Sequence, residues 1–87
     1  MKSQALPGFW AAFGKLPPKI QTTAWKNYAL WLQHPGLKSL EFKKIKDDLW
    51  SIRAGSGYRA LGTFIDGTYV WFWIGPHDEY ERLLRSL

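Results

Sequence analysis

Two arginines flank a glycine turn in the stretch WSIRAGSGYRALG, residues 50–62. If residues 55–57 form a three-residue loop between two strands, Arg53 faces Arg59 and both side chains leave the same face of the sheet. Like charges in this position repel each other by up to about 1 kcal/mol, and an anion between them reverses the sign. A guanidinium matches a phosphate with a planar fork of donors. The spacing is therefore compatible with a phosphate site, or with two exposed strand arginines whose stems cover tryptophans.

A histidine and a tyrosine near the C-terminus form a second candidate group. His77 follows a long apolar run and precedes the start of a helix, and Tyr80 lies three residues further on. The ordinary pKa of histidine is about 6.5, so His77 is suited to giving or taking a proton at neutral pH. In the alternative interpretation, His77 only precedes the helix cap and Tyr80 packs in the core.

Three lysines, Lys43, Lys44 and Lys46, form a basic segment ahead of the arginines. Strand alternation predicts Lys44 and Lys46 on one face, and Lys43 with Glu41 on the other. A solvated edge strand has a similar composition, because lysine protects sheet edges. We expect the other histidine, His34, to cover a helix end. Two distant histidines without a matching carboxylate pattern do not indicate a metal site, so we expect neither a metal nor a cofactor.

The elements that carry these residues change type near residue 39. Before that point, apolar stripes at helical spacing predict helices over residues 9–15 and 18–33. After it, the pattern predicts strands over residues 39–45, 49–55, 58–65 and 68–75. Asp78 and Glu81 have the spacing of a capping box at the start of a short final helix. The expected core residues are Trp31, Phe72 and Ile74.

These elements predict an α+β fold in a single domain over residues 1–87. A helical hairpin should pack on a twisted antiparallel sheet of about four strands, followed by a short C-terminal helix. Six tryptophans, four tyrosines and five phenylalanines supply apolar area for the core of this small chain.

The composition is that of a small basic protein. The formal net charge is +5, which favours an acidic partner, either nucleic acid or protein. The chain has no cysteine, so it contains neither disulfides nor thiolate ligands, and it is compatible with a reducing cytoplasm. No segment is long and apolar enough for a signal peptide or a membrane span, so we expect a cytoplasmic protein without a membrane partner.

The order of the motifs resembles the RelE/ParE superfamily of bacterial toxins, which belong to type II toxin–antitoxin systems. The resemblance runs from about residue 9 to the C-terminus through the segments LPPKIQ, SLEFKKI, WSIRAGSGYRALG and WFWIGPHDEYERLL. The segment GYRALG followed by IGPHDEY is its most specific part. The resemblance implies the fold predicted above, and a cytoplasmic bacterial protein that a small acidic antitoxin neutralises.

RelE-like members cut messenger RNA on the ribosome without a metal, since the ribose 2′-OH attacks its own 3′ phosphate. The resemblance assigns phosphate stabilisation to Arg59, which follows Gly-Tyr as in the family, and less directly to Arg53. It implies acid–base or stacking roles for His77 and Tyr80. We therefore expect Arg59 on an exposed concave face, with the other three residues around one phosphate. The basic residues ahead of the hairpin would bind RNA: Lys43, Lys44 and Lys46.

The sequence departs from the family pattern at both ends. Many members begin with an edge strand, and we expect none here because the chain before Phe9 is short. The segment HDEYE is acidic, and its carboxylates would compete with a phosphate for the positive end of the helix. ParE-like members inhibit DNA gyrase without cutting RNA. The expected function is thus a ribosome-dependent mRNA endoribonuclease, and the alternatives are a gyrase inhibitor or a degenerate member that only binds antitoxin.

Overall fold

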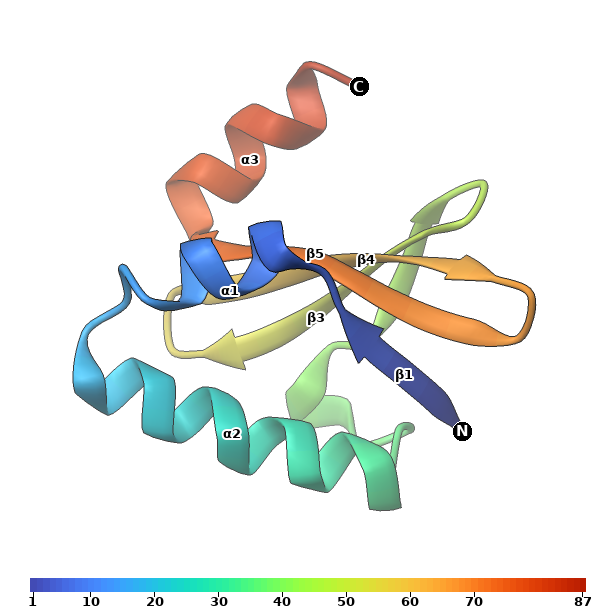
Figure 1. Cartoon of the computed structure of the whole chain (residues 1–87), viewed down its shortest axis with the longest axis horizontal. Coiled ribbons are helices and arrows are strands. Elements are labelled where there is room, and N and C mark those ends of the chain that lie inside the picture. The colour runs from blue at the N-terminus through green and yellow to red at the C-terminus, as the bar shows by residue number, and fades with distance from the viewer.

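The computed structural model describes residues 1–87 and contains one five-stranded sheet with three α-helices. The strand order is β1-β5-β4-β3-β2. Figure 1 shows α2 along one face of the sheet and α3 rising from the other. The elements along the chain are β1 (Lys2–Ala5), α1 (Pro7–Phe13), α2 (Pro18–Gln33), the 3₁₀ turn η1 (Lys38–Leu40), β2 (Lys43–Lys46), β3 (Leu49–Gly55), β4 (Tyr58–Ile65), β5 (Thr68–Pro76) and α3 (His77–Arg85).

This architecture confirms the predicted α+β fold with two corrections to the sheet. Strands β2 to β5 are antiparallel neighbours, as expected. The short segment before Phe9 does form a strand, because β1 pairs in parallel with β5, from Lys2 beside Thr68 to Ala5 beside Trp71. The sheet is therefore mixed and has five strands. The prediction of no N-terminal strand was wrong because the edge of β5 offers unpaired backbone groups, and a strand of only four residues can satisfy them.

Both predicted N-terminal helices are present, and α1 begins two residues earlier than expected, at Pro7 instead of Phe9. Pro7 and Pro18 lie at the start of their helices, where the missing N–H costs no hydrogen bond. His34 is the C-cap residue of α2. None of the helices is long and apolar enough to cross a bilayer.

The indole of Trp31 lies at the centre of the core. It is completely buried, at 0% exposure. The rings of Tyr28, Phe42, Tyr69 and Trp71 surround it at centroid distances of 5.9, 5.4, 5.4 and 5.4 Å. Edge-on aromatic pairs add about 0.5–1.5 kcal/mol each to the effect of burial. The predicted packing of α2 across the sheet is thus confirmed, with one tryptophan as its main anchor.

Of the other expected core residues, Ile74 is buried and Phe72 is only half-buried. The strand β5 bulges at Phe72, because the residues on either side, Trp71 and Trp73, pair with consecutive positions of β4. The extra residue interrupts the alternation of side chains. Phe72 lines a shallow hollow next to Leu83 of α3 instead of the aromatic core.

The hairpin between β3 and β4 has the expected arginine pair but a different turn. Arg53 pairs with Arg59, as predicted, whereas Gly55 pairs with Tyr58, so the turn has two residues and β3 bulges just before it. Gly57 has a φ of 77°, a left-handed conformation that glycine adopts without a steric penalty. Since the bulge lies beyond the arginine pair, Arg53 and Arg59 keep their shared face.

The segment predicted as a strand over residues 39–45 begins as a turn. Leu40 ends η1 and is buried in the core, and Glu41 follows with φ 45° and ψ 43°. A non-glycine residue in this left-handed region costs about 1–2 kcal/mol. The strand β2 begins only at Lys43. The kink turns the chain from the aromatic core to the edge of the sheet, where Glu41 lies.

The final helix begins at His77 without the predicted capping box. Pro76 is the N-cap residue and no side chain caps the helix, so Asp78 and Glu81 do not have the expected roles. The backbone N–H of His77 donates to the carbonyl oxygen of Gly57 at 2.9 Å. This bond joins the start of α3 to the β3–β4 turn, which supplies the partner that a cap would otherwise provide.

We predict that Trp31→Ala lowers the free energy of unfolding by about 3–5 kcal/mol, because it empties the centre of the core. Trp25→Ala, at a tryptophan of the same helix that is 52% exposed, should cost less than half as much. Urea denaturation followed by circular dichroism measures both. Equal losses for the two variants would contradict the assignment of Trp31 as the anchor of α2.

Candidate functional site

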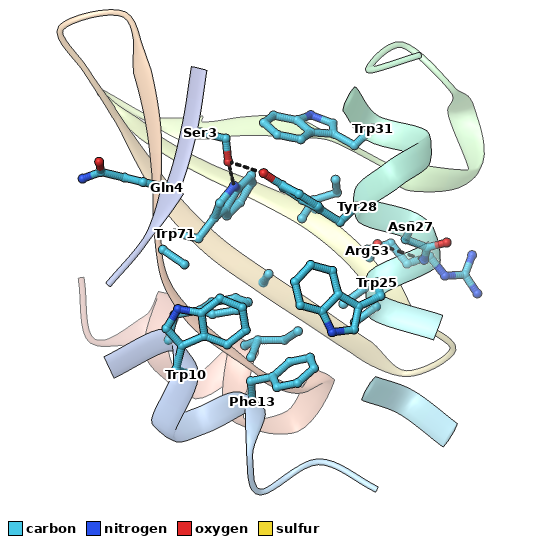
Figure 2. Close-up of a pocket in the computed structure, with 17 residues that line it drawn as sticks. Ser3, Gln4, Trp10, Phe13, Trp25, Asn27, Tyr28, Trp31, Arg53 and Trp71 are labelled. Carbon is cyan, nitrogen blue, oxygen red and sulfur yellow. Dashed lines mark hydrogen bonds between the residues drawn. The ribbon is translucent and has the colours of Figure 1, made fainter. Parts of the chain in front are cut away.

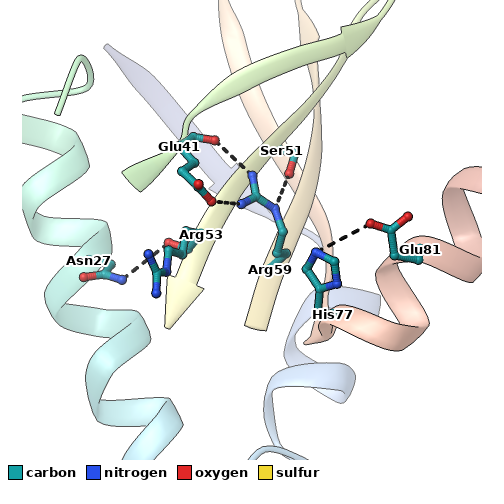
Figure 3. A network of polar contacts seen from close by, with 7 residues as sticks. All are labelled: Asn27, Glu41, Ser51, Arg53, Arg59, His77 and Glu81. Carbon is teal, nitrogen blue, oxygen red and sulfur yellow. Dashed lines mark hydrogen bonds and ion pairs between the residues drawn. The ribbon is translucent and has the colours of Figure 1, made fainter. Parts of the chain in front are cut away.

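The side chain of Arg59 is buried, contrary to the expectation of an exposed residue, and Arg59 is only 4% exposed. Its guanidinium donates from Nε to Ser51 Oγ at 2.8 Å, from Nη1 to the Glu41 carboxylate at 2.8 Å and from Nη2 to the Glu41 carbonyl oxygen at 2.9 Å (Figure 3). The side chain therefore reaches from β4 across β3 to the edge of the sheet. The Glu41 carboxylate neutralises the charge that sequence analysis assigned to a phosphate.

Two residues of α3, His77 and Tyr80, lie next to this group. Together with Glu41, Ser51 and Arg59 they form the arginine cluster. The ring of Tyr80 lies 5.2 Å from Cζ of Arg59, at cation–π distance. Tyr80 is 3% exposed, so in this conformation it packs against Arg59 and has too little free surface to stack on a nucleotide base. The His77 ring lies 5.5 Å from that of Tyr80, and its Nε2 lies 3.5 Å from a carboxylate oxygen of Glu81. His77 is exposed, so its ring is accessible from the solvent.

Arg53 is the exposed member of the arginine pair and forms no ion pair. Its backbone carbonyl accepts a hydrogen bond of 3.4 Å from Asn27 Nδ2, which links β3 to α2. Figure 3 shows the guanidinium on the side of α2, turned away from that of Arg59. The structure thus brings Arg59, Tyr80 and His77 together, and leaves Arg53 beside them with a free guanidinium.

All three lysines are exposed on the edge strand β2, but they occupy other faces than expected. The strand bulges between Lys44 and Lys46, which reverses the face of every residue beyond the bulge. Lys43 pairs directly with Ser51, so it shares the face of Ser51 and Arg59. The bulge brings Lys46 to that same face and leaves Lys44 on the aromatic face. The predicted grouping of Lys44 with Lys46 was therefore wrong.

Several solved structures have the same arrangement of elements. The RelB–RelE antitoxin–toxin complex from Methanococcus jannaschii matches with a TM-score of 0.71 at 16% identity, over 91% of this chain and 95% of that chain. The isolated E. coli RelE toxin matches with a TM-score of 0.65 at 19% identity, over 99% and 98% of the two chains. The RelBE2 toxin–antitoxin complex from Mycobacterium tuberculosis matches with a TM-score of 0.63 at 23% identity, over 86% and 95%.

The chain has the RelE fold. The shared fold confirms the resemblance to RelE-like toxins that the sequence motifs indicated. No protein-family model and no curated protein sequence matches the chain.

Within this RelE fold, two residues of the arginine cluster were not indicated by the sequence pattern. Glu41 was expected only as a strand residue opposite the lysines, and Ser51 had no role. A signal for Glu41 was available, since it is the only acidic residue among residues 1–46. Ser51 is completely buried on a strand of a small core, and a buried hydroxyl needs a partner. Neither signal identifies Arg59 as the partner, because the partner depends on the kink at residue 41.

A second candidate site of this chain is a mostly apolar groove of about 260 Å³ between α1, α2 and the sheet. Trp10 and Phe13 of α1 and Trp25 of α2 gather along it, and Arg53 lines its border (Figure 2). Trp10 and Trp25 are 45% and 52% exposed. Exposed tryptophans in a groove are characteristic of surfaces that bind another molecule.

We predict that Arg59→Ala lowers the free energy of unfolding by about 3 kcal/mol, because it leaves the buried Ser51 hydroxyl without its donor and removes the buried partner of the Glu41 ion pair. Arg53→Ala is a matched control on the paired position of the neighbouring strand, and should change the stability by about 0.5 kcal/mol or less. Urea denaturation of both variants measures the difference. A similar small loss for Arg59→Ala would show that its network contributes little to the fold.

Proposed function

We propose that the chain is the toxin of a type II toxin–antitoxin pair. Its RelE fold carries this proposal, since RelE toxins and RelB–RelE complexes are the structures that it resembles over nearly their whole length. The partner would be a small acidic antitoxin, which suits the net charge of +5. The groove between α1 and α2 would receive an amphipathic segment of this partner, with apolar side chains against Trp10 and Trp25 and acidic ones near Arg53.

The activity that we propose is metal-independent cleavage of mRNA on the ribosome. The supporting observation is that Arg59 lies against Tyr80, which is next to His77, and that the unpaired cations Arg53 and Lys43 are on the same face of the sheet as Arg59. In such a reaction the 2′-OH loses a proton and attacks the adjacent phosphorus, and the 5′ oxygen leaves with a proton. Arg59 would stabilise the charge on the pentacoordinate phosphorus, and oriented donors of this kind contribute about 10²–10³ in rate.

His77 would transfer a proton in this reaction, either from the 2′-OH or to the leaving 5′ oxygen. It lies at the exposed start of α3, and its ring is 5.5 Å from that of Tyr80, which packs on Arg59. Tyr80 would position Arg59 through its ring, instead of stacking on a base. Lys43 and Lys46 would contact neighbouring phosphates, because they share the face of Arg59.

A second candidate function is inhibition of DNA gyrase without catalysis. Two observations favour it: Glu41 neutralises Arg59, and the first turn of α3 carries Asp78 and Glu79. Negative side chains at a helix N-terminus oppose the binding of a phosphate there. In this case the exposed groove and the free guanidinium of Arg53 would contact protein instead of RNA.

We predict that His77→Ala reduces ribosome-dependent mRNA cleavage by about 10²–10⁴, because it removes a positioned proton-transfer group. His34→Ala is the matched control, since His34 is also exposed but is the C-cap residue of α2, which lies on the other side of the sheet from α3. Primer extension on mRNA from arrested cells measures cleavage, and plasmid supercoiling is followed in parallel. If wild-type protein arrests growth with intact mRNA and altered supercoiling, the gyrase function is correct and the nuclease is not.

We predict that Trp25→Ala weakens the complex with the proposed acidic antitoxin by about 30-fold or more, as expected for an aromatic anchor in a groove. Ile65→Ala is the matched control, because Ile65 has the same 52% exposure at the distant β4–β5 turn. Isothermal titration calorimetry measures both affinities. Equal affinities for the two variants would show that the antitoxin binds to another surface.

A further inference from the structure

The three acceptors around Arg59 differ in how firmly they are held. Ser51 Oγ belongs to a completely buried residue of β3, and the Glu41 carbonyl oxygen is part of the main chain. The Glu41 carboxylate is carried by a flexible side chain that is 54% exposed. A rotation about the side-chain bonds of Glu41 can remove this carboxylate without disturbing the other two hydrogen bonds.

Departure of the carboxylate would leave an oriented anion site. The Ser51 and Glu41 main-chain bonds would still fix the plane of the guanidinium, and the Tyr80 ring would still lie against it at 5.2 Å. Nη1 would then present unpaired N–H groups at the position where the carboxylate oxygen lies now, 2.8 Å away. A phosphate oxygen forms the same kind of charge-assisted bond with a guanidinium as a carboxylate oxygen does.

We infer that Glu41 closes this site in the free protein. Its carboxylate occupies the position of a phosphate oxygen, and a phosphate of the substrate must displace it before Arg59 can act. The identity of that phosphate, a group of an RNA backbone, rests on the proposed function. The competition between Glu41 and an oxyanion does not depend on any cleavage.

The replacement of the Glu41 carboxylate by a phosphate is physically feasible because the Glu41 side chain is already 54% exposed to solvent. Its carboxylate regains hydrogen bonds to water when it leaves, and Arg59 exchanges one oxyanion for another. A polyanion gains further contacts that Glu41 lacks, since Arg53 is unpaired on the adjacent strand and Lys43 projects from the same face. Glu41 would therefore keep the buried Arg59 paired in the absence of RNA, and bound RNA would take the place of the Glu41 carboxylate.

Inorganic sulfate is the probe that tests this inference without RNA chemistry. Glu41→Gln keeps the size of the side chain and removes its charge, so sulfate should bind about tenfold or more tightly than to the wild type. The Nε–Hε resonance of Arg59 in NMR spectra should move during the titration, which identifies the site. Asp66→Asn removes the same charge at the exposed β4–β5 turn, at the other end of β4 from Arg59, and should leave the affinity within about twofold of the wild type.

Glu41→Asp provides a second variant, in which the charge remains but the shorter side chain no longer reaches Arg59, and a smaller gain is expected. Unchanged sulfate affinity in both variants, a gain equal to that of Asp66→Asn, or a stationary Arg59 resonance would each overturn the inference. So would loss of folding in both variants, because Glu41 would then be a structural partner that cannot leave. A sulfate gain without RNA cleavage by any variant would refute the nuclease and leave the closure by Glu41 intact.

Discussion

A guanidinium buried in a small protein needs acceptors for its donors, and the partners of Arg59 come from three other segments of the chain. Ser51 comes from β3, Glu41 from the corner before β2, and the ring of Tyr80 from α3. The network therefore joins four segments of the chain around one charge. Burial of a charge is costly unless it is paired and hydrogen-bonded, so the network favours the one arrangement of these segments that satisfies Arg59.

The two faces of the sheet carry different kinds of side chain. The face under α1 and α2 is aromatic, with Trp31 at its centre, and it provides most of the buried apolar area. The opposite face carries the arginine cluster and part of the lysine edge. The aromatic face also leaves Trp10 and Trp25 half-exposed along a groove, which a partner can cover. A basic protein with such a groove suits an acidic amphipathic segment that orders when it binds.

Bulges decide which residues share a face. An extra residue in β2 moves Lys46 to the face of Arg59, and an extra residue in β5 removes Phe72 from the core. The bulge in β3 lies at the end of the strand and leaves the arginine pair in register. Because side chains alternate with a period of two, a single inserted residue reverses every assignment beyond it. The positions of the bulges therefore determine which side chains lie together in the candidate site.

The sequence by itself determined the α+β class, the range of α2, the four antiparallel strands and the pairing of Arg53 with Arg59. These features follow from local periodicity and turn chemistry, which neighbouring residues specify. Only the tertiary structure decided that β1 adds to β5, that Arg59 is buried against Glu41, and that Tyr80 packs on Arg59. Each of these depends on contacts between residues that are at least 18 positions apart, from Glu41 to Arg59 and from Ala5 to Trp71. No periodic pattern in the sequence indicates the left-handed backbone at Glu41 or the bulges. Packing and hydrogen bonding select these features only when the whole chain has folded.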